Sequence, residues 1–334
     1  MSAVTLKMIA AELSLSVATV SKALADSYEI SQATKNTVSE AAQRLGYVAN
    51  PYASSLRKRR SKTIAVVLPE IADSFFAQAI NGIETITQAF GYHVLIYLSH
   101  ESFLREQAIM QYFKSGRVDG ILMSVSEETS DTSHIKDVID DDIPVVFFDR
   151  VCEDLPTAQI VTNDFESSFN ATHHLLSKSC HKIAFIANSG SLSINRNRVL
   201  GYQKALQSVG NSNELIVNCG KNDEENYQLL TSLFNQEERP DGVILSVEKL
   251  TPLVYQVCND LGVTIPTQVK VLTFTNLGIA SFMNPALTTV NQPAFEMGQA
   301  AAKALFKKLS QNIEVLDPEL VILPSKLICR ESTR

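Results

Sequence analysis

The chain has 334 residues, of which 45% are hydrophobic and 19% are charged, and its formal net charge is −7. The length allows a small module followed by a large core. No apolar run approaches the ~18 residues that a membrane span needs, and no secretory signal precedes the first predicted helix. These features argue against a membrane or secreted protein, and we expect a cytoplasmic one.

The stretch from Val4 to Leu24 predicts two short helices joined by a tight turn. Apolar residues recur at helical spacing on both sides of Ser14, and Thr5 and Ser16 are of the types that begin helices. The second helix presents small polar side chains and Lys22, a face that suits the DNA major groove. A two-helix hairpin is also common in ordinary helical packing, so this pattern alone leaves both interpretations open.

The next segments favour DNA binding. A third helix is predicted from Ser31 to Leu45, ending at Gly46, and Asn50-Pro51 then begin a very short helix that runs into four basic residues. Residues 1–60 contain eight Lys/Arg and four Asp/Glu, a net charge of +4, so the remainder carries −11 of the total of −7. A basic module on an acidic body is typical of a nucleic-acid-binding protein.

The first 68 residues resemble the headpiece and hinge of the lactose-repressor (LacI/GalR) family of transcription regulators. The motifs TVSKAL, RLGY, NP, SLR and SKTIAV carry the resemblance, with Ser14 replacing the usual turn glycine and Lys22 the usual arginine. The resemblance implies a headpiece (1–48) and a hinge (49–61) that bind a palindromic operator as a homodimer, with Leu56 wedged between base pairs in the minor groove. The residues expected at double-stranded DNA are Thr5, Ser16, Val17, Ala18, Thr19, Ser21, Lys22, Tyr47, Asn50, Ser54, Leu56 and Arg57.

From Lys62 onward, short apolar runs alternate with amphipathic helices. Runs that are almost continuously hydrophobic predict strands buried on both faces of a parallel sheet. The alternation therefore predicts doubly wound α/β layers, and there are more crossovers than one sheet needs. The predicted strands cover residues 64–68, 94–98, 120–125, 145–148, 183–187, 242–247 and 269–274.

The family resemblance extends to the C-terminus through PALTTVNQ, EMGQAAAKAL and CREST. It implies an effector-binding core (62–334) of two doubly wound parallel-sheet subdomains, like a periplasmic binding protein, behind the all-α helix-turn-helix headpiece. The expected first subdomain takes residues 62–162 and 291–320, and the second takes residues 163–290 and 321–334.

A ligand crevice is expected at the carboxyl ends of the strands. Aromatic faces beside carboxylates and an arginine suit a sugar or sugar derivative. The alternatives are that Asp73 only caps a helix and that the phenylalanines belong to the core. Arg196 has the pattern of a surface charge, but the resemblance of NRNRVLGYQKAL to a family motif implies that it contacts the effector. The expected effector-binding residues are Asp73, Phe75, Phe76, Asp149, Asn163, Arg196, Glu248 and Thr275.

Two departures from the family pattern leave the effector open. The chain has Thr275-Asn276 where the family has paired aspartates, and Val247-Glu248 where it often has Asn-Asp. The sequence also does not determine whether the effector releases DNA or promotes its binding, or whether the assembly is a dimer or a tetramer.

An enzyme is not expected, and neither is a cofactor or a metal. No glycine-rich nucleotide loop follows any predicted strand, and the adjacent His173 and His174 diverge on a helix. The turn from Ser179 to Lys182 contains a formal Ser-x-x-Lys and a Cys180 expected to be exposed. A sugar-binding protein, or an α/β enzyme with an accessory DNA-binding module, is the alternative.

Overall fold

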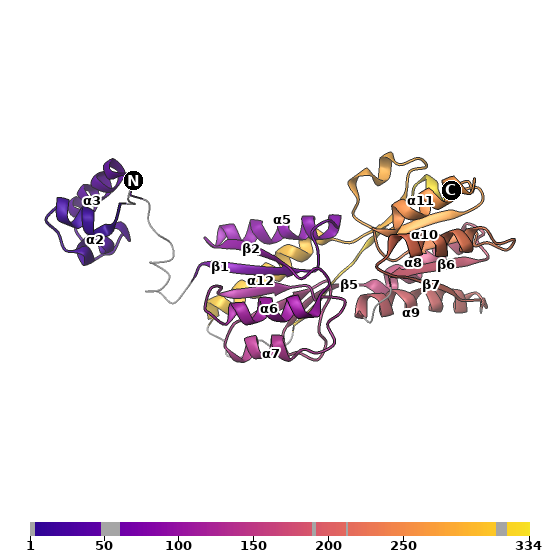
Figure 1. The fold of residues 1–334 in the computed structure, drawn as a ribbon, viewed down its shortest axis with the longest axis horizontal. Coiled ribbons are helices and arrows are strands. Elements are labelled where there is room, and N and C mark those ends of the chain that lie inside the picture. The colour runs from indigo at the N-terminus through magenta and orange to yellow at the C-terminus, as the bar shows by residue number, and fades with distance from the viewer. Residues whose placement is uncertain (1–3, 48–60, 189–191, 212, 312–318) are drawn as a thin grey trace. The chain divides into compact units, whose positions relative to one another are not determined.

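The computed structural model of the chain describes residues 4–47, 61–188, 192–211, 213–311 and 319–334 (Figure 1). The chain divides into two compact units, residues 1–61 and residues 62–334. None of the described helices is long and apolar enough to cross a membrane.

The first unit is a three-helix module. Its helices are α1 (Leu6–Glu12), α2 (Val17–Leu24) and α3 (Gln32–Leu45). They bury one small apolar core, which consists of Ile9, Ala10, Val20, Ala23, Val38, Ala41 and Ala42. Alanine dominates this core because the short helices pack closely, and the larger side chains lie around its rim.

Side-chain caps fix where two of these helices begin. Ser16 accepts a hydrogen bond from the backbone N–H of Thr19 at 3.0 Å, and Ser31 caps α3 in the same way. Gly46 ends α3 in the left-handed conformation, at φ 68°. Thr5 precedes α1 but makes no capping bond with its side chain, so the cap predicted there is absent.

The turn between α1 and α2 explains one departure from the family pattern. Ser14 lies in the left-handed region at φ 53°. A glycine adopts this conformation without a steric penalty, whereas a serine pays a modest one.

The second unit begins with a six-stranded parallel sheet in the order β11-β5-β4-β3-β1-β2. Helices α5 and α12 cover one face of the sheet, and α6 and α7 cover the other. The strands are β1 (Thr63–Leu68), β2 (His93–Leu98), β3 (Gly120–Met123), β4 (Val145–Phe148), β5 (Ala158–Thr162) and β11 (Leu320–Leu323). The helices are α5 (Ser74–Ala89), α6 (Phe103–Phe113), α7 (Ser133–Asp140) and α12 (Ala294–Gln311).

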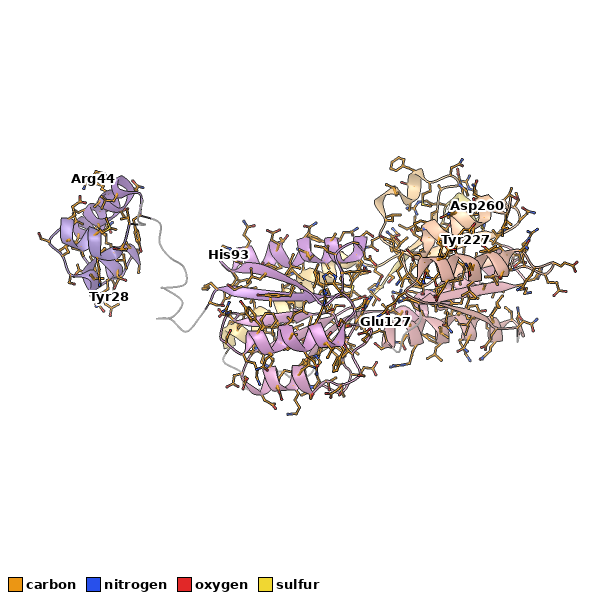
Figure 2. All side chains as sticks on the ribbon, viewed as in Figure 1. Tyr28, Arg44, His93, Glu127, Tyr227 and Asp260 are labelled. Carbon is orange, nitrogen blue, oxygen red and sulfur yellow. The ribbon has the colours of Figure 1, made fainter. Side chains whose placement is uncertain are left out.

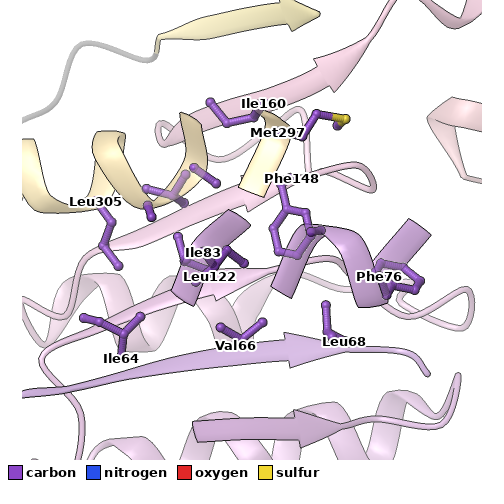
Figure 3. Packing of buried hydrophobic residues seen from close by; sticks show 14 of the residues in the cluster. Ile64, Val66, Leu68, Phe76, Ile83, Leu122, Phe148, Ile160, Met297 and Leu305 are labelled. Carbon is purple, nitrogen blue, oxygen red and sulfur yellow. The ribbon is translucent and has the colours of Figure 1, made fainter. Parts of the chain in front are cut away.

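Figure 3 shows the core beneath α5 and α12, where side chains from four strands meet those of the two helices. The helices approach closely because each has a glycine at the contact. A Cβ atom on Gly82 would lie 2.1 Å from the carbonyl oxygen of Phe295, and one on Gly298 would lie 2.1 Å from that of Ala79. Residues from opposite ends of the core sequence therefore form one packed layer.

A second six-stranded sheet has the order β12-β10-β9-β8-β6-β7 and is parallel except for β12. Helices α8 and α9 pack on one face, and α10 and α11 pack on the other. The strands are β6 (Ile183–Asn188), β7 (Leu215–Cys219), β8 (Gly242–Leu245), β9 (Lys270–Phe274), β10 (Thr288–Asn291) and β12 (Lys326–Ile328). The helices are α8 (Asp164–Ser177), α9 (Ser193–Ser208), α10 (Asp223–Phe234) and α11 (Leu250–Asp260), with 3₁₀ turns η1 (Gly278–Phe282) and η2 (Glu331–Thr333).

The chain crosses between the two sheets three times: after β5, after β10 and after β11. The last crossing lies later than expected. Residues from 321 onward were predicted to belong to the second subdomain, but β11 pairs in parallel with β5 of the first sheet. The boundary was misplaced because an edge strand followed closely by another short strand has no sequence feature that assigns it to one sheet.

Candidate functional site

The exposed face of α2 is the candidate DNA-reading surface. Val17 is 39% exposed and Ala18 is also exposed, while Val20 and Ala23 on the opposite face fill the core. Small side chains at the start of the helix let its backbone approach base edges. The face predicted from the sequence is thus turned to solvent.

The other predicted DNA residues differ in their surroundings. Thr19 and Ser21 are half-buried, Thr5 is exposed, and Lys22 forms an ion pair with Glu29. The ring of Tyr47 packs against the core of the unit. Asn50, Ser54, Leu56 and Arg57 lie outside the described residues.

A crevice lies between the two sheets of the second unit and holds about 540 Å³ of empty space, part of it open to solvent. Six of the eight predicted effector residues line it. They come from the segments that follow the carboxyl ends of strands in both sheets: Asp73, Phe75, Phe76, Asp149, Glu248 and Thr275.

Two arginines line the crevice, Arg150 and Arg198, and neither is among the predicted effector residues. Arg198 is the one that comes from α9. Its side chain is 2% exposed, its Nε donates to Asp164 at 2.7 Å, and its Nη1 donates to the carbonyl of Ser246 at 2.5 Å. Its guanidinium lies over the ring of Phe274, 4.1 Å from the centroid. It is therefore held rigidly on α9 by partners from three other segments.

Arg196 does not line the crevice. It is 57% exposed and lies 3.6 Å from Glu153 on another surface. Residues two positions apart on a helix point ~200° apart, so Arg196 and Arg198 cannot share a face. Arg198 shares its face with the buried Tyr202, and this periodicity is the signal that identifies it.

Asn163 also lies away from the crevice. Its side-chain oxygen accepts hydrogen bonds from Ser167 Oγ and from the backbone N–H of Ser325, both at 2.8 Å. It borders a separate hollow beside β11. Its position at the start of α8, where the chain crosses between the sheets, gives it a structural role.

Burial changes the electrostatics of the crevice. Desolvation raises the pKa of Asp73 to about 6, against an opposing hydrogen bond from the backbone of Phe75. Desolvation likewise raises the pKa of Asp149 to about 6, although Arg150 and Arg198 favour its charged form. Both carboxylates are therefore costly to keep ionised.

Hydrogen bonds join the two subdomains across the crevice. Glu248, after β8, accepts from the backbone N–H of Ser74 at 3.2 Å and from the hydroxyls of Ser74 and Thr275. The carboxamides of Gln78 and Asn276 bond to each other at 3.1 Å. Glu127, labelled in Figure 2 where the subdomains meet, accepts from Asn188 at 3.1 Å.

Two buried atoms that line the crevice have no hydrogen-bond partner among the described residues. One is Nη2 of Arg198, a charged donor, and the other is Oδ1 of Asn188, an acceptor. Leaving such groups unsatisfied costs about 1–3 kcal/mol each. One unused donor and one unused acceptor on residues of the same lining are suited to a hydroxyl-bearing ligand.

Cys180, His173 and His174 each contact neighbouring side chains of the fold. Cys180 is buried rather than exposed, and burial raises the pKa of its thiol to about 12, because its side chain packs under β8. His174 bonds to Thr333, while His173 stacks on Phe169. Within the described segments, no group of three or more His, Cys, Asp or Glu could hold a metal ion.

Comparison with known proteins agrees with this architecture. Residues 5–50 match the lacI family of bacterial regulatory proteins, and residues 172–333 match a periplasmic binding protein-like domain. Catabolite control protein A of Priestia megaterium is 27% identical over 335 residues, covering 99% of both chains.

Solved structures share the fold. A lac repressor dimer bound to operator and the anti-inducer ONPF has a TM-score of 0.86 at 20% identity, covering 99% of both chains. A complex of the transcriptional regulator CelR with cellobiose has a TM-score of 0.74 at 23% identity, covering 98% of this chain and 99% of that one.

The helix-turn-helix unit and the two-sheet core are thus found together in known regulators, over nearly the full length of each. The chain belongs to the LacI family of bacterial regulatory proteins: it is a DNA-binding transcriptional regulator with an effector-binding core.

Proposed function

We propose that the protein is a repressor that binds a palindromic operator as a homodimer and is switched by a small polyhydroxylated effector. The observation that carries this proposal is the pair of unsatisfied polar atoms, on Arg198 and Asn188, buried between two sheets in a chain that also has a helix-turn-helix. Such a repressor acts where the DNA is, in the cytoplasm.

Aromatic and charged groups support a sugar or sugar derivative as the effector. Phe75 and Phe76 line the crevice with Phe274, and aromatic rings cover the apolar faces of sugars. Asp149 and Arg198 supply a carboxylate and a guanidinium, which bind hydroxyl pairs. The related CelR structure contains cellobiose.

Exposed apolar residues support a dimer. In η1, Ile279 is 61% exposed and Phe282 is 86% exposed, and Leu95 and Ile96 are exposed on β2 at the edge of the first sheet. Neighbouring exposed apolar side chains, as on η1 and on β2, are a feature of protein–protein interaction sites. A twofold dimer would present two copies of α2, which is the reason to expect a palindromic operator.

On DNA, we propose that Ser16, Val17 and Ala18 contact bases in the major groove, while Lys22 contacts a base or a phosphate. We further propose that the hinge residues Asn50, Ser54 and Arg57 contact DNA and that Leu56 enters the minor groove. A helix as short as the hinge cannot be stable alone, so it should form only when two copies pair on DNA. A change in subdomain closure would then control DNA binding through the hinge.

The test is an operator selected from random DNA, followed by fluorescence anisotropy with and without a sugar panel. We expect the selected sites to be palindromic and one sugar to change the affinity in the wild type but not in Arg198→Met. Selected sites without twofold symmetry would refute the palindrome.

The dimer is tested separately by sedimentation equilibrium of Phe282→Asp. This variant should dissociate at concentrations where the wild type is dimeric. Leu200→Asp is the control, since Leu200 is also an apolar residue that is more than half exposed, but on α9. A Phe282→Asp protein as dimeric as this control would remove η1 from the interface.

A further inference from the structure

The crevice has more negative than positive charge. Three carboxylates line it, on Asp73, Asp149 and Glu248, together with the guanidinium groups of Arg150 and Arg198. No other charged side chain among the described residues lines it.

Both guanidinium groups already have carboxylate partners from outside the lining. Arg150 bonds to the two carboxylate oxygens of Glu101 at 2.8 and 2.9 Å, and Arg198 bonds to Asp164 at 2.7 Å. These two pairs are neutral. Arg150 Nε also lies 3.9 Å from Asp149, so two guanidinium groups face five carboxylates in all. Asp73, Asp149 and Glu248 therefore lack a full countercharge between them.

The three carboxylates also disfavour one another's charge. Glu248 is among the groups that raise the pKa of Asp73, after desolvation, and Asp73 is among those that raise the pKa of Asp149. Like charges that share a buried site are costly, and a cation placed among them relieves both the repulsion and the burial of charge.

The site also has more unused hydrogen-bond acceptors than donors. Asn188 belongs to this lining, is nine-tenths buried, and has an acceptor atom, Oδ1, without a partner among the described residues. With the carboxylates, acceptors outnumber the one unused donor, on Arg198. A ligand rich in donors satisfies such a site, whereas a phosphate, which only accepts, would face three carboxylates.

We propose that the effector carries an ammonium group beside its hydroxyls, as an amino sugar does, and that Asp73, Asp149 and Glu248 select that ammonium group. Arg198 and Asn188 bind the hydroxyls. This inference rests on the proposed effector site in the crevice and adds to it the charge of the effector. Neutral sugars would lose the ion pair, and sugar phosphates would be repelled.

The experiment is isothermal titration calorimetry of the full chain at pH 7.5 with matched probes of gluco, galacto and manno configuration. Each set contains the 2-amino sugar, the parent sugar and the 6-phosphate. We expect an amino sugar to bind at least 10-fold more tightly than its parent, and no phosphate to bind. A parent sugar or a phosphate that binds as tightly as the amino sugar overturns the proposal.

Two variants locate the selectivity. Glu248→Gln should reduce the preference for the amino sugar to under about 3-fold, while Glu153→Gln, which removes an exposed carboxylate outside the crevice lining, should leave it unchanged. Arg198→Met distinguishes the two levels of the proposal. If the wild type binds a neutral sugar and Arg198→Met does not, the effector site is supported and only the charge selectivity is overturned. If Arg198→Met still binds the amino sugar, the site itself is overturned.

The surplus of negative charge in the crevice can also be tested without a ligand, through the melting temperature, if the true effector is not one of these sugars. Asp73→Asn keeps the cap on α5, because asparagine caps helices as well as aspartate does, and it removes one uncompensated charge. Its melting temperature at pH 7.5 should exceed that of the wild type, with Glu153→Gln unchanged. A melting temperature at or below the wild-type value would show that the crevice has no surplus of negative charge.

Discussion

Replacing Arg198 with alanine tests whether the effector binds in the crevice, which Arg198 lines, or at the nearby surface, where Arg196 lies. Arg198 is almost fully buried and binds Asp164 and the carbonyl of Ser246. Arg198 lines the crevice, and its third guanidinium nitrogen has no partner among the described residues. The substitution therefore removes a structural ion pair and the proposed effector contact together.

The expected loss of stability follows from the partner left behind. Asp164 is buried and would retain the hydroxyl of Thr162, at 3.0 Å, but no countercharge. Breaking a buried pair in this way costs about 3–5 kcal/mol. Loss of a buried charge-assisted contact to the effector costs about 2–5 kcal/mol, which is roughly 30-fold or more in affinity.

Arg196→Ala is the matched control. Arg196 and its partner Glu153 are both more than half exposed, and such pairs contribute about 0–1 kcal/mol. The unfolding free energy is measured from urea titrations followed by circular dichroism, because the chain has no tryptophan for fluorescence. Effector affinity is measured by calorimetry.

The double variant Arg198→Ala, Asp164→Asn separates the two roles of the arginine. It leaves no unpaired charge at position 164, so much of the stability should return while effector binding stays lost. The reasoning is refuted if Arg198→Ala unfolds within about 1 kcal/mol of the wild type. It is equally refuted if Arg196→Ala, rather than Arg198→Ala, abolishes the effector response.

Three further outcomes are expected. The stability of the core should fall as pH rises from about 4 to 6, because the folded-state pKa of Asp73 is about 6 against about 3.9 unfolded, so the folded state binds the extra proton in this window. Asp73→Asn should remove its share of this slope, and a melting curve with the same slope in both proteins would contradict the assignment. Glu29→Gln should strengthen operator binding several-fold and steepen its salt dependence by about one ion, because it removes a carboxylate that pairs with Lys22. Fluorescence anisotropy across a salt series measures both effects. Weaker operator binding would contradict the prediction. Ser14→Gly should slow amide hydrogen exchange in the α1–α2 turn by relieving a left-handed serine, worth about 0.5 kcal/mol, with faster exchange as the contrary result.

The sequence predicts the fold well where packing leaves a periodic pattern. The apolar runs at β1, β3, β4, β6, β8 and β9 are almost wholly buried, as the sequence implied. The run at β2 is also a strand, but Leu95 and Ile96 are exposed. Hydrophobicity alone does not distinguish an interior strand from an edge strand whose outer face is open.

The prediction fails where burial is incomplete or the element is short. The strands β7, β11 and β12 lie near or at sheet edges, and most of their side chains are only partly buried, so the sequence does not predict them. The acid-rich start of α10 is not predicted either. At the site, strand ends located six of eight residues because chain direction determines which edge they occupy. The family motif predicts Arg196 as the effector residue, whereas helical periodicity favours Arg198, which lies on the same face of α9 as Tyr202.

The contacts across the crevice also indicate which residue can control the switch. An effector moves a two-state equilibrium from 1:99 to 99:1 only if it favours one state by about 5.5 kcal/mol. The rim pair of Lys221 and Glu128 is about half exposed and contributes at most about 1 kcal/mol, and the neutral bond between Gln78 and Asn276 contributes a similar amount. Only buried charges supply energies of the required size. We therefore expect the switching energy to come mainly from Arg198 and from the carboxylates of Asp73, Asp149 and Glu248. Substitutions at the rim should tune the effector response, whereas substitutions at these four residues should weaken it strongly.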